Sequence, residues 1–392
     1  MNFCIFSANY LPHIGGIERY TYYLSKELIK RGHNVTVVTE NVVKGETHEI
    51  SDGIEIFRFP CYNLINGRYP ITKKNKFSKE IDTEINGRKF DFVIINARFY
   101  LHSIYAAKFA HKHSIPMITI EHGSSHLLVN NRLFDYFGAK WEHFITERLK
   151  KYCKDYYGVS KAACDWSGHF GIKPKGVLYN SIDLTEIENL CENPVCDYRK
   201  DLGIPKPAKV IVFTGRLIKE KGIYQLAKGF ISLNDSNAYL LIAGDGPEMQ
   251  GLKDIGGEHI YLLGKLDFSH IIALLKDSDI LCLPSVSEGM STSVLEAAAT
   301  KTFVITTKTG GSKELINSDE LGIVTDGNTE DEVFKALKCA IQNDEYRDSA
   351  TQKAYDRLKE YFVWEKTADK VEDICKKTKG IRNENADNNS GI

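Results

Sequence analysis

Short apolar segments alternate with helix-like stretches in two successive series along this chain, and that alternation most restricts how it can fold. The strand-like segments of the first series lie at residues 2–8, 35–39, 92–95 and 116–120. Those of the second series lie at 210–213, 239–242, 280–283 and 303–306. Segments that are apolar on both faces belong between two helix layers, as in a parallel α/β sheet. The pattern predicts an α/β protein with two doubly wound parallel-sheet domains.

The two series also set the expected domain boundaries. We predict an N-terminal Rossmann-like domain at 1–183 and a C-terminal one at 207–362, joined by a linker at 184–206 that is rich in Pro, Asn and charge. The amphipathic stretch 363–378 is expected to pack back on the first domain. Residues 380–392 are rich in Asn and poor in apolar side chains, so we expect a disordered tail there.

Composition excludes several classes of protein. Among 392 residues, 42% are apolar and 26% are charged, which is typical of a soluble globular protein. The formal net charge is −1, so no nucleic-acid partner is indicated. No run of 18 apolar residues occurs and the first residues do not resemble a secretion signal, so we expect a cytoplasmic protein. Nine cysteines without a Cys-x-x-Cys pair are expected to be free thiols.

The most informative segment follows the strand-like run 280–283 and spans residues 284–299. Glu288 lies in a loop of small residues, and Glu296 lies in a helix that is expected to begin near Ser291. Unpaired N–H groups at the start of such a helix form an anion site suited to a diphosphate. The two carboxylates can accept hydrogen bonds from sugar and ribose hydroxyls. The segment therefore predicts a nucleotide-sugar site.

This segment resembles the Glu-x7-Glu motif of glycosyltransferase family 4, including the preceding Pro-Ser and the Ala-rich helix that follows. The resemblance implies a retaining glycosyltransferase of GT-B architecture, in which two Rossmann-like domains face each other across a cleft. It also implies that Glu288 contacts the donor sugar and Glu296 the ribose. Further donor contacts are expected from Gly289, Met290, Ser291, Thr292 and Ser293. Many members carry Gly where this chain has Ser291, so the donor sugar is left open.

A second motif directly follows the first strand-like segment of the second domain. Arg216 and Lys221 lie five residues apart in a loop that begins at Gly215. A bidentate guanidinium and an ammonium on such a loop can clamp a diphosphate. The loop resembles the family's Gly-Arg-x-x-x-x-Lys-Gly motif, in which both cations neutralise the leaving nucleotide diphosphate. Gly264 and Lys265, after a later strand, are expected to border the nucleotide base.

Transfer of a sugar leaves negative charge on the departing diphosphate, and fixed cations stabilise that charge selectively in the transition state. Arg216, Lys221 and the amides of residues 291–293 can fill the role of a metal ion. No Asp-x-Asp motif follows a strand-like segment. We therefore expect no metal cofactor.

The first domain contains fewer specific sequence motifs for donor binding than the second. Gly15 and Gly16 follow the first strand-like segment and could allow close approach to the donor, or could serve only a turn. His122 ends the segment 119–123 and resembles a family histidine that contacts the donor sugar or the reacting centre; a solvated or capping histidine is the alternative. His126 is a less favoured candidate.

Residues 66–77 combine four cations with two aromatic residues and no acid. Such a stretch could lie on an anionic membrane surface, and a solvated loop is the alternative. The resemblance implies transfer of a hexose or N-acetylhexosamine from a UDP- or GDP-sugar to a glycan or polyprenyl-linked glycan. Such a step belongs to cell-surface polysaccharide biosynthesis at the inner face of the cell membrane.

Two alternatives remain open at this point. A nicotinamide-dependent dehydrogenase would need Gly-x-Gly-x-x-Gly after the first strand, and residues 7–20 lack it. A non-catalytic partner that binds the nucleotide sugar for another transferase would not need all four of Arg216, Lys221, Glu288 and Glu296. Hydrolysis of the donor would exclude this second alternative.

Overall fold

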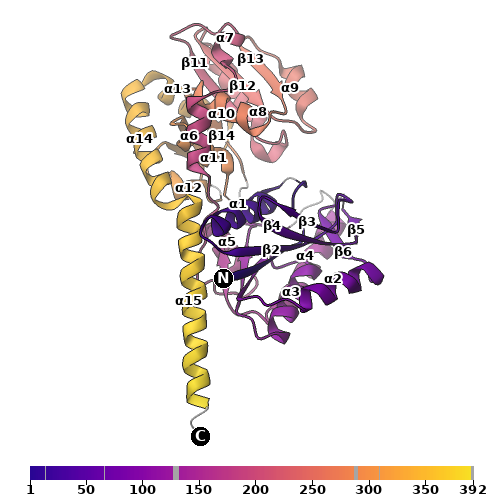
Figure 1. Cartoon of the computed structure of the whole chain (residues 1–392). Helices are drawn as coiled ribbons and strands as arrows, with labels where there is room; N and C mark the ends of the chain where they lie inside the picture. Colours follow the sequence, from indigo (N-terminus) through magenta and orange to yellow (C-terminus); the bar gives the residue numbers. More distant parts are fainter. Residues whose placement is uncertain (14, 66, 127–131, 287–289, 309, 390–392) are drawn as a thin grey trace. The chain divides into compact units, whose positions relative to one another are not determined.

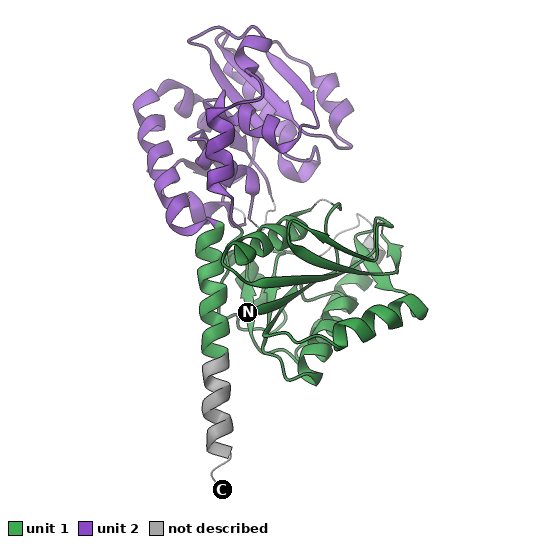
Figure 2. Ribbon diagram, viewed as in Figure 1, with its two compact units in different colours: residues 1–180, 364–392 green, residues 181–363 purple. Residues whose placement is uncertain are grey.

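The computed structural model describes the chain except residues 14, 66, 127–131, 287–289, 309 and 390–392, and the chain divides into two compact units (Figures 1 and 2). Unit 1 comprises residues 1–180 and 364–392, and unit 2 comprises residues 181–363. Each unit contains its own twisted sheet of mainly parallel strands with helices on its faces. The predicted α/β fold with two Rossmann-like domains is confirmed.

The sheet of unit 1 has eight strands in the order β10-β9-β8-β7-β1-β2-β4-β3, and all neighbours are parallel except β3 and β4. In chain order these strands are β1 (Asn2–Ser7), β2 (Asn34–Glu40), β3 (His48–Ser51), β4 (Ile54–Phe59), β7 (Phe92–Asn96), β8 (Met117–Glu121), β9 (Tyr156–Gly158) and β10 (Gly176–Val177). A separate antiparallel hairpin consists of β5 (Cys61–Leu64) and β6 (Tyr69–Thr72). The helices are α1 (Gly16–Lys30), α2 (Lys76–Asn86), α3 (Leu101–Lys112), α4 (Arg132–Leu149), α5 (Lys161–Gly168) and α15 (Trp364–Asn389).

Helix α1 packs on the sheet of unit 1 through apolar residues at helical spacing. Its residues Tyr20, Leu24 and Leu28 recur at helical spacing and are completely buried against β1 and β2. The helix ends at Lys30, and Gly32 follows with a φ of +81°, which suits glycine, while the His33 N–H donates to the Leu28 carbonyl oxygen. The C-terminal helix α15 packs alongside α1 and buries Trp364, Ala368, Val371 and Cys375 in the same core (Figure 1).

The sheet of unit 2 has six parallel strands in the order β13-β12-β11-β14-β15-β16. They are β11 (Lys209–Thr214), β12 (Ala238–Ala243), β13 (Ile260–Gly264), β14 (Ile280–Leu283), β15 (Phe303–Thr307) and β16 (Ile323–Thr325). The helices are α6 (Leu184–Glu192), α7 (Tyr198–Asp201), the 3-10 turn η1 (Lys219–Lys221), α8 (Ile223–Leu233), α9 (Met249–Ile255), α10 (Phe268–Lys276), α11 (Thr292–Ala299), α12 (Ser312–Leu315), α13 (Glu330–Gln342) and α14 (Asp344–Tyr361).

The segment 184–206, which we expected to be a linker, instead contains helices α6 and α7 and belongs to unit 2. The side chain of Asp183 accepts a hydrogen bond from the Glu186 N–H at the start of α6, and Asp197 caps α7 in the same way. Ile187 is completely buried, and α6 packs against α10. The two helix caps and the buried Ile187 stabilise helices in a segment whose composition resembles that of a linker.

The predicted disordered tail at 380–392 reaches into residues 390–392, which lie outside the described part of the chain, and it stays a prediction.

Two further features concern the predicted thiols and the membrane. All nine cysteines are free thiols, as expected. Within the described part of the chain, no helix is both long enough and apolar enough to cross a bilayer.

Candidate active site

The loop that carries Arg216 leaves β11 between two fixed backbone positions. The Gly215 N–H donates to the Ala243 carbonyl oxygen at 3.0 Å, and the Leu217 N–H donates to the Asp245 carbonyl oxygen at 2.9 Å. The side chain of Leu217 is completely buried, whereas Arg216 is exposed. The guanidinium is therefore presented to solvent from a backbone that is held on both sides.

The strand ends of unit 2 approach each other very closely at this edge of the sheet. A β-carbon at Gly244 would lie 1.8 Å from the Gly215 carbonyl oxygen, so only glycine fits there. The Gly244 N–H donates in turn to the carbonyl oxygen of Gly264 at 2.7 Å, and Lys265 follows as an exposed side chain. The predicted residues Gly215, Arg216, Gly264 and Lys265 thus lie at the carboxyl ends of β11 and β13, the parallel strands on either side of β12. Open α/β sheets bind their ligands at such strand ends.

Among the described residues, three contacts join the stretch 214–222, which carries Arg216 and Lys221, to the segment that follows β14. A β-carbon at Gly222 would lie 2.1 Å from the Pro284 carbonyl oxygen. The Val286 N–H donates to the Glu220 carbonyl oxygen at 2.9 Å, and the Ser293 hydroxyl donates to the Thr214 carbonyl oxygen at 3.1 Å. The two motifs, separated by about seventy residues in the sequence, therefore form one packed structure.

Helix α11 begins at this junction. Ser291 precedes the first helical residue and is buried, but its side chain makes no capping hydrogen bond to the first-turn amides. Met290 and Glu296 are also buried, while Thr292 and Ser293 are half-buried. The positive end of the helix dipole thus lies beside the cation loop, which is a favourable combination for an anion. Glu288 and Gly289 lie outside the described residues.

In unit 1, His122 occupies the loop after β8 and is held by a hydrogen-bond relay. The carboxamide oxygen of Asn96 lies 3.0 Å from His122 Nε2, and the Asn96 amide nitrogen donates to the Thr21 hydroxyl at 2.7 Å. Because a carboxamide oxygen can only accept, Nε2 carries the proton and Nδ1 keeps its lone pair. Burial lowers the pKa of His122 to about 3, so the imidazole is neutral near pH 7.

A buried ion pair anchors this histidine loop, and the sequence did not reveal it. Glu121 accepts hydrogen bonds from the N–H groups of His122 and Gly123 at 3.1 and 2.9 Å, and its other carboxylate oxygen lies 2.7 Å from Arg98 Nε. Both side chains are almost completely buried. Burial raises the pKa of Glu121, and the Arg98 guanidinium opposes that shift. Arg98 also donates to the Thr146 hydroxyl at 3.0 Å. The ion pair thus holds the backbone from which His122 projects.

Gly15 and Gly16 lie at the start of α1, but their surroundings differ. A β-carbon at Gly15 would lie 2.5 Å from a carboxylate oxygen of Glu18, while no atom of the described residues lies within 4 Å of one at Gly16. The Glu18 carboxylate lies 2.6 Å from His13 Nδ1. Gly15 therefore makes room for the His13–Glu18 pair, whereas the position of Gly16 leaves space for a ligand.

Comparison with known proteins adds independent information about the family. Residues 14–186 match the model of "Glycosyltransferase Family 4", and residues 196–357 match that of "Glycosyl transferases group 1". An uncharacterized glycosyltransferase of Methanocaldococcus jannaschii is 25% identical, over 94% of this chain and 97% of its own. One subunit of the human phosphatidylinositol N-acetylglucosaminyltransferase is 22% identical, over 95% of this chain and 75% of its own.

A solved structure agrees with the fold. The structure of Anabaena HepE in complex with UDP-glucose has a TM-score of 0.73 with this chain at 15% identity, covering 96% of this chain and 100% of that one. Two family models that together span most of the chain, and a relative similar over nearly its whole length, lead to one conclusion. The chain belongs to the family 4, group 1 glycosyltransferases and has the GT-B fold.

Proposed function

We propose that this glycosyltransferase moves a hexose or an N-acetylhexosamine from a UDP- or GDP-sugar to a glycan or lipid-linked glycan acceptor. The observation that carries the proposal is the packing of the Arg216–Lys221 loop against the segment that leads into α11. These contacts place the side chains of Arg216 and Lys221 and the N-terminus of α11 at one edge of the unit 2 sheet. The contacts are Gly222–Pro284, Val286–Glu220 and Ser293–Thr214.

The proposed chemistry follows from that arrangement of charge. The bond between the anomeric carbon and the β-phosphate oxygen breaks, and a bond from the anomeric carbon to an acceptor oxygen forms, while the acceptor hydroxyl loses its proton. Negative charge accumulates on the departing diphosphate. Arg216, Lys221 and the first amides of α11 would stabilise that charge more strongly in the transition state than in the bound donor. We propose that this suffices without a metal cofactor and that, as the family resemblance implies, the anomeric configuration is retained.

Roles for individual donor contacts extend the same proposal. Glu296 would accept hydrogen bonds from the ribose, and Glu288, outside the described residues, from the sugar. Gly264 and Lys265 would border the base, and the neutral His122 would contact the donor sugar. HepE has been solved with UDP-glucose, which supports a uridine nucleotide as the first donor to test.

We further propose that unit 1 rests on an anionic lipid surface, where a lipid-linked acceptor would be presented. Four aromatic side chains of α4, here called the aromatic stripe, are 41–59% exposed at helical spacing: Tyr136, Phe137, Trp141 and Phe144. The Lys140 ammonium lies over the Tyr136 ring at 4.4 Å, and the Arg148 guanidinium lies over the Phe144 ring at 4.5 Å. Aromatic side chains beside cations are typical of surfaces that bind the headgroup region of anionic bilayers.

The aromatic stripe continues into the basic segment 66–77. Trp141 Nε1 donates to the Tyr69 hydroxyl at 2.8 Å, which joins α4 to β6. At the start of α2, Phe77 is 61% exposed beside the exposed Lys74 and Lys76. The name of the human relative includes phosphatidylinositol, a membrane lipid, which supports a lipid acceptor here.

A thermal-shift panel tests the donor proposal. A ligand that binds only the native state stabilises it by about 2.7 kcal/mol at a concentration of 100 Kd. We expect one of UDP, GDP or their sugars to raise the melting temperature, equally with and without EDTA, and NAD to leave it unchanged. Absence of a shift with every nucleotide would contradict the proposal, and a shift with NAD alone would favour the dehydrogenase alternative.

A second measurement separates an enzyme from a non-catalytic donor-binding protein. Incubation with the stabilising nucleotide sugar should release free nucleotide diphosphate, slowly by hydrolysis and faster with an acceptor. Binding without any release would favour the non-catalytic alternative. The anomeric coupling constant of the product, measured by NMR, would test retention.

A further inference from the structure

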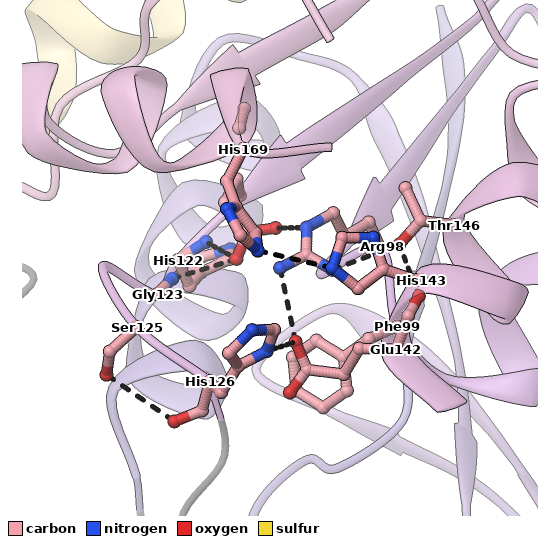
Figure 3. Close-up of polar contacts among 12 residues, drawn as sticks. Arg98, Phe99, His122, Gly123, Ser125, His126, Glu142, His143, Thr146 and His169 are labelled. Carbon is pink, nitrogen blue, oxygen red and sulfur yellow. Dashed lines mark hydrogen bonds and ion pairs between the residues drawn. The ribbon is translucent and has the colours of Figure 1, made fainter. Parts of the chain in front are cut away.

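We propose that His126, His143 and His169 form a binding site for one divalent transition-metal ion, with Zn²⁺ as the reference ion. One ring nitrogen from each residue lies within 4.8 Å of those of the other two. The three residues come from separate segments of unit 1: the loop after β8, helix α4 and the residue that ends α5 (Figure 3). Imidazole nitrogen is a preferred ligand of zinc and its neighbours in the first transition row.

The closest pair already has the spacing that a shared ion requires. His143 Nε2 and His169 Nε2 lie 3.2 Å apart. Two nitrogens bound at 2.0–2.1 Å to a tetrahedral ion are separated by about 3.3 Å. An ion could therefore bind both rings with almost no rearrangement, and His126 would supply the third nitrogen after a small side-chain rotation.

His126 is oriented by a carboxylate, as metal-binding histidines commonly are. Its Nδ1 lies 2.9 Å from Glu142 Oε2. Because an ionised carboxylate can only accept, Nδ1 carries the proton and the lone pair is on Nε2, the atom then able to bind a metal. The same carboxylate oxygen lies 3.4 Å from Arg98 Nη2.

Aromatic neighbours hold the rings in place. The Trp166 ring stacks on His169 with centroids 4.8 Å apart and an interplanar angle of 6°. The Phe170 ring lies 4.6 Å from the ring of His143. His126 and His143 are half-buried and His169 is exposed, so an ion could enter from solvent and keep water as a further ligand.

The ion would tie together three segments that are otherwise far apart in the sequence. One of them is the loop that carries His122, four residues before His126. We therefore assign the site a structural role, in which metal binding restrains the histidine loop and stabilises unit 1. No step of sugar transfer is routed through this ion.

Metal binding to the untagged, full-length protein tests the proposal. After removal of metals by a chelator, titration with Zn²⁺ followed by calorimetry should reveal one ion bound per chain. Titration with Co²⁺ should produce the visible absorption bands of a low-coordinate nitrogen site. His143→Ala and His169→Ala should each weaken binding at least about 100-fold, because each removes a direct ligand.

The matched control is His270→Ala, which removes a partly exposed histidine of α10 in unit 2 and should bind the ion as the wild type does. Without metal, the urea unfolding midpoint of His169→Ala should fall only slightly below that of the wild type, since the side chain is exposed and loses mainly its stacking on Trp166. With saturating Zn²⁺, only the wild type and the control should gain thermal stability. Absence of Zn²⁺ binding by the wild type, or unchanged affinity in both His143→Ala and His169→Ala, would overturn the proposal.

Discussion

Gly222 and Pro284 lie so close that a β-carbon on the glycine would be 2.1 Å from the proline carbonyl oxygen. Gly222 also has a φ of +69°, in the left-handed region. This contact joins the loop that presents Lys221 to the segment that leads into α11, and so fixes the two donor-binding motifs against each other.

Substitution of Gly222 by alanine should therefore be costly for both stability and activity. The left-handed backbone alone costs a side chain roughly 1–2 kcal/mol, and the steric conflict with Pro284 should add about 1–3 kcal/mol. Gly203→Ala is the matched control, because Gly203 has a φ of +64° and nothing within 4 Å of an added β-carbon. Urea unfolding should separate the two variants; equal losses of stability would show that the Pro284 contact does not constrain this loop.

Loss of either basic side chain of the cation loop should impair turnover much more than folding. Arg216→Ala and Lys221→Ala should each lower kcat/KM about 10²- to 10³-fold, as expected when one group that stabilises transition-state charge is removed. Lys219→Ala, in the same loop and exposed, should leave kcat/KM within about threefold of the wild type. Initial rates with the donor identified by thermal shift provide the measurement. Wild-type rates in both variants would refute the diphosphate clamp.

Removal of Arg98 should destabilise unit 1 strongly. Arg98→Leu would leave the carboxylates of Glu121 and Glu142 buried without their cation, which costs about 3–5 kcal/mol. The control is Arg88→Ala, at a partly exposed arginine that pairs with Glu55 and Glu84 and should cost no more than about 1 kcal/mol. If chemical denaturation gave the two variants similar free energies of unfolding, the buried pair would not be the anchor of the histidine loop.

The depressed pKa of His122 predicts a pH dependence of stability. The pKa of His122 is about 3 in the folded protein and about 6.5 in the unfolded chain. Between these two pH values the unfolded chain therefore binds one more proton than the folded protein does. The contribution of His122 to the free energy of unfolding is complete above the pKa of the unfolded chain. It is lost as the pH falls toward the pKa of His122 in the folded protein. Between pH 6.5 and 4.5 the loss should amount to about 2 kcal/mol.

His122→Gln should remove this part of the pH dependence, because glutamine can still donate to the Asn96 oxygen but does not titrate. Free energies of unfolding for both proteins, measured by urea at several pH values, should therefore converge as the pH falls. Parallel profiles would mean that burial does not depress the His122 pKa.

The aromatic stripe should bind anionic vesicles. Phe137→Ser combined with Phe144→Ser should reduce co-sedimentation with vesicles containing phosphatidylglycerol several-fold, because two apolar anchors are lost. Val195→Ser with Ile231→Ser is the matched control, since both of these apolar side chains are 44–50% exposed on unit 2. Equal binding by the two double variants, or none by the wild type, would argue against a membrane surface here.

Local patterns in the sequence were sufficient for much of the fold and for the two donor motifs. The run Val210–Phe213 is apolar on both faces, so it could only be a central strand, and β11 is completely buried there. Because parallel strands end at the same edge of a sheet, the residues after β11 and β14 could be expected to meet. The linker prediction failed because composition does not reveal that Asp183 caps a helix and that Ile187 finds a buried position.

By itself the sequence determined the eight central strands that it predicted and the cations of the donor loop, because each depends on neighbours within a few residues. Only the tertiary structure decided that Arg98 meets Glu121 and that His126, His143 and His169 surround one point. These side chains are separated by 17 to 43 residues, and no local periodicity encodes such a distance. Their proximity arises from how the helices pack on the sheet, which is set by burial of apolar surface throughout unit 1.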